Sequence, residues 1–78
     1  MMFVELKKQE YYRGGHISNP VMFAVDDIAR VVRCTDDYDF TNIITKDGKV
    51  HTITERYEDV VKKIRDAERR QDGQYRKN

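Results

Sequence analysis

The 78-residue sequence has one cysteine, one proline and no tryptophan. The single cysteine, Cys34, excludes a disulfide within the chain and favours a reducing compartment. No apolar run approaches the ~18 residues that a membrane span needs. The apolar start at residues 1–6 is short and is followed by Lys7 and Lys8, which does not fit a signal peptide. We therefore expect a cytoplasmic protein with no membrane partner.

The length of the chain is enough for one domain, which we place at residues 1–70, with a flexible basic tail at residues 71–78. A core of this size seldom supplies more than ~3–5 kcal/mol, so small chains often add disulfides, a metal or a second subunit. A disulfide is excluded and metal ligands are sparse. Self-association as a homo-oligomer is therefore one expectation, and well-idealised packing of a monomer is the alternative.

Charge is distributed unevenly although the net charge is only +1. Residues 1–61 carry eight basic and eleven acidic side chains, whereas residues 62–78 carry seven basic and three acidic ones. The basic end is a candidate contact for nucleic acid or an acidic partner, and its alternative role is a solvated helix face. The candidate contact residues are Lys62, Lys63, Arg65, Arg69, Arg70, Arg76 and Lys77.

The clearest element in the pattern is an amphipathic helix from Glu55 to Arg70. Its apolar residues recur at spacings of three and four, which is the helical period. Thr54 is the expected N-cap, and Glu58 is expected to pair with Lys62 one turn later. The apolar stripe contains Tyr57, Val60, Val61, Ile64 and Ala67.

A β-hairpin is expected before this helix. Residues 40–45 and 50–53 are rich in β-branched and aromatic side chains. Asp47-Gly48 lies between them and suits a two-residue type I′ turn, which requires positive φ angles.

This turn sets the register of the predicted hairpin. It pairs Ile44 with His51 and places Phe40, Ile44 and Ile53 on one face. We expect that face to pack against the helix, because Ile53 leads directly into it.

Further strands are expected upstream, at residues 3–8, 21–25 and 28–34, with a turn at Gly14-Gly15. Pro20 suits the beginning of a strand or an edge strand. The sequence thus predicts an α+β fold, in which a small antiparallel sheet of four or five strands is followed by one C-terminal amphipathic helix.

This order of elements resembles the small bacterial and phage-borne proteins of the flagellar FlbD-like family. The resemblance covers residues 3–66 and rests on the stretch 25–31, the hairpin at 43–50 and the helix at 55–64. It supports the topology and implies a phage or prophage context, but it carries no catalytic motif. The chain departs from the family in its basic end and in the pair Tyr11-Tyr12.

Residues capable of chemistry are few and scattered. His16 and His51 are interpreted as a loop histidine and a half-exposed strand histidine, and Cys34 as a small buried side chain at a strand end. Zinc needs three or four ligands, and no pair among these residues has ligand spacing. Aspartates cluster where the chain must turn, which Asp favours. We expect no enzyme activity, no metal and no cofactor.

The tyrosines Tyr11, Tyr12 and Tyr38 fall outside the expected core. Beside Lys7, Lys8 and Arg13, such rings suit stacking on nucleic-acid bases, but they also suit protein interfaces or packing across strands. Two functions stay open. The first is a non-enzymatic protein-interaction or regulatory module, which binds another protein or itself through open sheet edges. The second is a nucleic-acid-binding module that uses the basic helix and tail.

Overall fold

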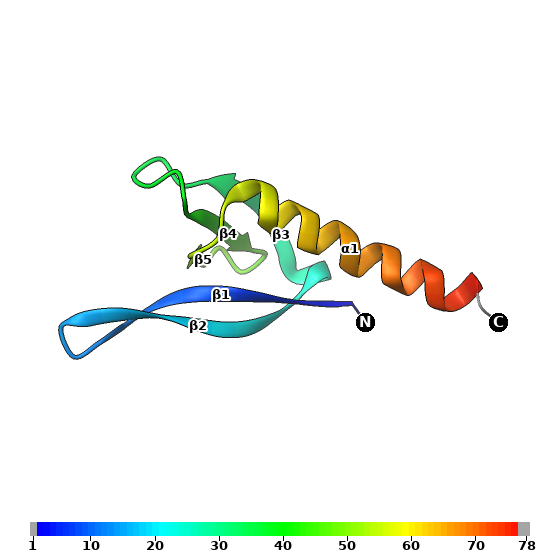
Figure 1. The fold of residues 1–78 in the computed structure, drawn as a ribbon, viewed down its shortest axis with the longest axis horizontal. Coiled ribbons are helices and arrows are strands. Elements are labelled where there is room, and N and C mark those ends of the chain that lie inside the picture. Colours follow the sequence, from blue (N-terminus) through cyan, green and yellow to red (C-terminus); the bar gives the residue numbers. More distant parts are fainter. Residues whose placement is uncertain (1, 77–78) are drawn as a thin grey trace.

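The structure, a computed structural model, describes the backbone of residues 2–76 and the side chains of residues 2–70. Its elements are β1 (Phe3–Tyr12), β2 (Gly15–Ala24), the 3₁₀ turn η1 (Val25–Asp27), β3 (Ile28–Arg33), β4 (Thr41–Thr45), β5 (Val50–Ile53) and α1 (Tyr57–Arg76). The strands form one antiparallel sheet in the order β2-β1-β5-β4-β3. Helix α1 lies across one face of this sheet (Figure 1). The predicted α+β fold is confirmed, with five strands.

The core lies between α1 and the sheet face that the helix covers. Val60 and Ala67, seven residues apart, lie on the same side of α1 and are both buried. Fully burying an aliphatic side chain is worth about 1.5–3 kcal/mol, so the stability of this fold depends on a small set of contacts. The buried apolar residues are Val4, Leu6, Phe23, Ile43, Ile53, Val60 and Ala67.

The hairpin of β4 and β5 forms as predicted, but its turn is of another type. The N–H of Thr45 donates to the carbonyl of Lys49 at 3.0 Å, which encloses a three-residue loop. In that loop only Gly48 has a positive φ, at 88°, whereas a type I′ turn needs two such residues. Asp47 has an ordinary backbone and accepts hydrogen bonds from the Thr45 hydroxyl and the Lys49 N–H.

The longer loop shifts the register of the hairpin by one residue, so the predicted pairing of Ile44 with His51 is wrong. His51 pairs with Ile43 instead. A shift of one residue exchanges the two faces of a strand. Ile43 is consequently buried beneath α1, while Ile44 and Phe40 are half-buried on the face without the helix. Ile53 faces the helix as predicted.

The first hairpin, β1 and β2, is longer than the sequence predicted. Both strands have ten residues, and their turn is centred on Arg13 and Gly14, with φ angles of 47° and 82°. Two successive positive φ angles are the signature of a type I′ turn. Pro20 lies in β2, an edge strand of the sheet, as its presence predicted.

Helix α1 begins at Tyr57, later than predicted, and extends to Arg76, beyond the predicted end at Arg70. Thr54 does not cap it: the Thr54 hydroxyl donates to the carbonyl of Lys7 at 3.3 Å. Glu58 pairs with Arg33 of β3 rather than with Lys62. The flexible basic tail predicted at residues 71–78 involves side chains outside the described residues, and it stays a prediction.

Candidate interaction surfaces

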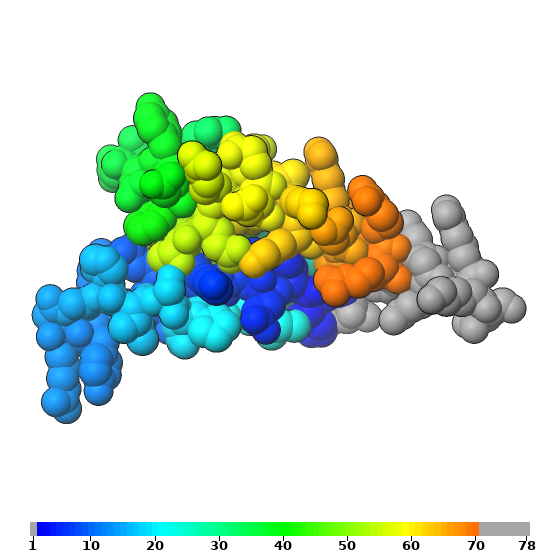
Figure 2. Space-filling view, viewed as in Figure 1, coloured from blue at the N-terminus to red at the C-terminus, as the bar shows by residue number. Residues whose placement is uncertain are grey.

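The far half of the first hairpin projects from the body of the molecule. Lys8 of β1 pairs with Ile53 of β5, and the Ser18 hydroxyl of β2 hydrogen-bonds to the Thr54 hydroxyl. Beyond these contacts the strands continue as the β1–β2 arm, which we define as residues 10–17. Figure 2 shows the arm standing clear of the sheet and helix. The arm therefore contributes no residue to the core.

The β1–β2 arm carries large apolar side chains in solvent. Tyr11 is 83% exposed, Tyr12 64% and Ile17 52%. Tyr11 makes an edge contact with His16 across the hairpin, with ring centroids 6.0 Å apart. The guanidinium of Arg13 lies 5.7 Å from the centre of the Tyr12 ring. The cross-strand packing considered from the sequence is thus present, but it leaves most of both tyrosine rings uncovered.

Tyr38, the third candidate aromatic, is not part of this surface. It lies in the loop between β3 and β4, and β3 is the opposite edge of the sheet from the arm. Its ring is 70% exposed. Sequence reasoning placed Arg13 beside the tyrosines but missed Ile17 as a member of the arm. In residues 15–24, apolar side chains recur at every second position at Ile17, Val21 and Phe23, which is typical of a strand. His16, Ser18 and Asn19 are poor strand formers and hid this pattern.

The basic residues of α1 divide between structural and exposed roles. Lys63 donates to the carboxylate of Glu55 at 2.5 Å and thereby braces the start of the helix. Asp66 lies 3.9 Å from both the Lys62 ammonium and the Arg69 guanidinium. Arg65 has no carboxylate within 4.0 Å among the side chains of residues 2–70. The carboxylates therefore dilute the positive charge of the helix.

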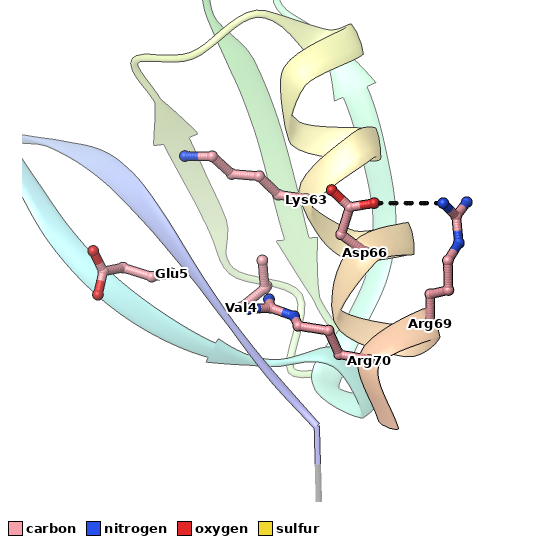
Figure 3. A pocket seen from close by; sticks show the side chains of 6 residues that line it. All are labelled: Val4, Glu5, Lys63, Asp66, Arg69 and Arg70. Atoms are coloured by element: carbon pink, nitrogen blue, oxygen red, sulfur yellow. Dashed lines mark ion pairs between the residues drawn. The ribbon is translucent and has the colours of Figure 1, made fainter. Parts of the chain in front are cut away.

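An open hollow separates the start of β1 from α1, as Figure 3 shows. Its volume is about 680 Å³. Cations and carboxylates alternate around it, so it lacks the single-sign field that concentrates an anion. Its lining consists of Val4, Glu5, Lys63, Asp66, Arg69 and Arg70. Arg76 and Lys77, the remaining basic candidates, lie outside the described side chains.

The two outer edges of the sheet differ in their capacity to pair. In β2, Pro20 pairs with Lys7. Hydrogen-bonded and non-hydrogen-bonded pairs alternate along the hairpin, starting from the hydrogen-bonded Tyr12–Gly15 pair that closes the turn. By this alternation the backbone nitrogen of Pro20 points away from β1. Proline has no N–H, so the β2 edge is interrupted at its middle. Strand β3 has no proline. The β3 edge thus keeps its N–H groups, but the pairing of β3 with β4 shifts in register between Ile28 and Arg30.

His51 is more enclosed than the sequence indicated. Its ring lies on the covered face with its centroid 5.3 Å from that of Phe23, and its Nδ1 is buried with no partner among the described residues. Burial, followed by the charge of Lys8, holds the pKa of His51 below its ordinary value. This position suits a packing residue rather than a proton donor or metal ligand.

No chemical site emerges elsewhere in the described part of the chain. Within residues 2–70 no three histidine, cysteine or acidic side chains gather as metal ligands. Cys34 is half-buried after β3. Helix α1, over its described residues, is not apolar enough to cross a membrane. No family model, curated protein or solved structure matches the sequence, and the FlbD-like resemblance stays a prediction.

Proposed function

We propose that the chain is a non-enzymatic module that binds another protein through its β1–β2 arm. The supporting observation is the exposure of Tyr11, Tyr12 and Ile17 on an arm, residues 10–17, that contributes no residue to the core. Soluble proteins expose clustered large apolar side chains mainly at interaction sites. Tyrosine is also enriched at the centre of protein interfaces.

The construction of the arm favours recognition of a partner surface. Because both strands are joined by ladder hydrogen bonds and a tight turn, the arm presents its side chains with little conformational freedom. Preorganised aromatic side chains lose less entropy on binding than flexible ones. The contacts of Tyr11 with His16 and of Arg13 with Tyr12 fix the rings further. Arg13 at the tip adds a charge that an acidic rim of the partner complements.

The proposal is tested by affinity capture from the organism that encodes the protein. The double variant Tyr11→Ser, Tyr12→Ser is compared with the wild type and with Tyr38→Ser, which removes an equally exposed tyrosine at the other edge. We expect the arm variant to lose the captured protein, and the control variant to retain it. Equal capture by the arm variant, with circular dichroism showing that it is folded, would refute the role of the arm.

A nucleic-acid-binding function is the second candidate. Lys62, Arg65 and Arg69 recur at helical spacing on the exposed side of α1 and line one surface hollow. Phosphate contacts of this kind weaken steeply with salt. Fluorescence anisotropy with labelled DNA and RNA at low salt tests this candidate. The wild type should bind, and the triple variant Lys62→Ala, Arg65→Ala, Arg69→Ala should not. Absence of binding by the wild type would exclude it.

A further inference from the structure

The tip of the β1–β2 arm holds an arginine in a backbone conformation that suits other residues better. Arg13 is the first central residue of the type I′ turn and has a φ of 47°. Within residues 2–76 it is the only residue other than glycine with a positive φ. Type I′ turns favour Asn or Asp at this position, because short polar side chains tolerate the left-handed region better than long ones. Arg13 therefore lowers the stability of the turn relative to Asn.

The fold offers Arg13 little compensation for this conformation. The side chain is exposed, and no carboxylate lies within 4.0 Å of its guanidinium among the side chains of residues 2–70. Its contact with the neighbouring Tyr12 ring, at 5.7 Å, lies in solvent, where such contacts are weak. Costly backbone conformations concentrate at binding sites, where they belong to the function. A contact outside the chain accounts for an arginine at this position.

One face of the arm places Arg13 beside an apolar surface. Residues two apart in a strand share a face, and so do cross-strand partners. Glu10 pairs with Ile17 and Tyr12 pairs with Gly15, so Tyr12 and Ile17 are diagonal neighbours on one face. Gly15 adds no side chain there, and a Cβ at its position would meet only the Tyr12 carbonyl oxygen, at 3.8 Å. The Tyr12 ring thus has no side chain directly opposite it and is open to a partner.

We propose that Arg13 is the specificity-determining residue of the arm and binds a carboxylate on an acidic segment of the partner protein. Apolar side chains next to that carboxylate then pack on Tyr12 and Ile17. A guanidinium presents its donors in a planar fork that matches the two oxygens of a carboxylate. This inference rests on the proposed function of the arm and adds the chemistry of the partner to it.

A protein carboxylate fits this surface better than the phosphates of a nucleic acid. Residues 10–17 carry one arginine and one glutamate, so the arm has no net charge, whereas nucleic-acid sites concentrate positive charge. Glu10 shares the face of Tyr12, and its carboxylate accepts from the Asn19 amide at 2.5 Å. A polyanion lying along this face would meet that negative charge. A single carboxylate at the tip contacts Arg13 without approaching it.

Selection from a phage-displayed library of random peptides tests the chemistry of the partner. We expect the wild type to enrich peptides in which Asp or Glu stands next to aromatic or aliphatic residues. Arg13→Glu should enrich peptides with Lys or Arg instead, because the sign of the contact is reversed. Arg30→Glu makes the same charge change at an exposed site on the opposite edge strand and should still enrich acidic peptides. Failure of the wild type to enrich acidic peptides would overturn the inference, and so would the same selection by Arg13→Glu.

The variant Arg13→Asn separates binding from folding. The dissociation constant of a labelled acidic peptide from the selection, measured by fluorescence anisotropy, should rise about tenfold or more in this variant. Arg13→Lys should lie between the two, since it keeps the charge but loses the fork. The urea midpoint of Arg13→Asn should equal or exceed that of the wild type, because Asn-Gly suits a type I′ turn. An unchanged peptide affinity, or a lower urea midpoint, would contradict the proposal.

Failure of this inference is distinguishable from failure of the arm function. Capture of a cellular protein depends on the arm if the double variant Tyr11→Ser, Tyr12→Ser loses it. Capture that depends on the tyrosines but survives Arg13→Asn would leave the arm function standing and refute the role of Arg13. Capture that neither change affects would refute the arm function itself.

Discussion

The backbone N–H of Lys7 donates to the carboxylate of Glu55 at 2.9 Å, so a side chain completes the junction between β1 and the segment that follows β5. The second oxygen of the same carboxylate accepts from Lys63 of α1. Next to it, the Thr54 N–H donates to the carbonyl of Lys7 at 2.8 Å. One glutamate therefore joins the first hairpin, the β5–α1 connection and the helix, and it holds the base of the β1–β2 arm in place.

Replacement of Glu55 should consequently destabilise the fold more than replacement of an exposed glutamate. The Glu55 side chain is 12% exposed, whereas that of Glu58, also in an ion pair, is 61% exposed. We expect Glu55→Ala to lower the free energy of unfolding by about 1–3 kcal/mol, because it leaves a backbone donor without its acceptor. Glu58→Ala should cost no more than about 1 kcal/mol. Urea denaturation measures both changes, and equal losses of unfolding free energy would contradict the role of Glu55 in joining the hairpin to the helix.

The register of the β4–β5 hairpin predicts unequal effects of one conservative substitution at adjacent positions. Ile43 is fully buried and Ile44 is half-buried on the opposite face. Ile43→Val should cost about 0.5–1.5 kcal/mol through the lost methylene and the space that remains. Ile44→Val should cost clearly less. Chemical denaturation of the two variants decides the point, and the reverse order would restore the register expected from a two-residue turn.

Gly48 is expected to be more sensitive to substitution than its surroundings suggest. A Cβ at this position would have no atom within 4 Å, so any cost comes from the backbone φ of 88°. Gly48→Ala should lower the free energy of unfolding by about 1–2 kcal/mol. Lys49→Ala, at the next position, is the control and should be close to neutral. Thermal denaturation of the pair measures the difference, and a neutral Gly48→Ala would argue against this turn.

His51 gives stability a defined dependence on pH. Burial lowers the pKa of His51 below the ordinary value of about 6.5, so the unfolded chain binds a proton at a higher pH than the folded chain does. The free energy of unfolding should then be complete above that value and decline as pH falls below it, by at most about 1.4 kcal/mol per pH unit. Urea midpoints at several pH values between 5 and 8 measure this decline.

The variant His51→Gln separates this effect from other titrations. Glutamine does not titrate, so the decline in stability between pH 7 and pH 5 should become shallower in this variant. Proton NMR of the His51 ring should also place its midpoint below that of the unfolded chain. A decline of unchanged steepness, or a midpoint at or above the unfolded value, would show that His51 is not the residue responsible.

The parts of the fold that the sequence predicts are those with strong local periodicity. The stripe from Tyr57 to Ala67 identifies α1, and the β-branched residues on either side of Asp47-Gly48 identify the hairpin. The predicted register of the hairpin was wrong, because Asp-Gly fits a three-residue loop as well as a two-residue one. The β1–β2 arm was only partly foreseen, since residues 15–20 are poor strand formers and hydrogen bonds to β1 hold them in place.

The candidate surfaces depended on contacts between residues far apart in the chain. Lys63 is one of the basic residues of α1, but its partner Glu55 lies before the helix. The predicted pair of Glu58 with Lys62 does not form, because Glu58 pairs with Arg33. Tyr11 and Tyr12 were placed outside the expected core from the sequence alone, but their location on the projecting β1–β2 arm follows only from the pairing of β1 with β2. The open β3 edge likewise follows from the strand order, which sequence patterns do not determine.

Site-specific photo-crosslinking in living cells tests the role of the β1–β2 arm most directly. A photoreactive amino acid replaces Tyr12 at the exposed arm, and in a matched strain it replaces Lys62 on the exposed side of α1. The account predicts a discrete protein adduct from position 12 that is absent or much weaker from position 62. Adducts from position 62 alone, or adducts with nucleic acid instead of protein, would contradict it.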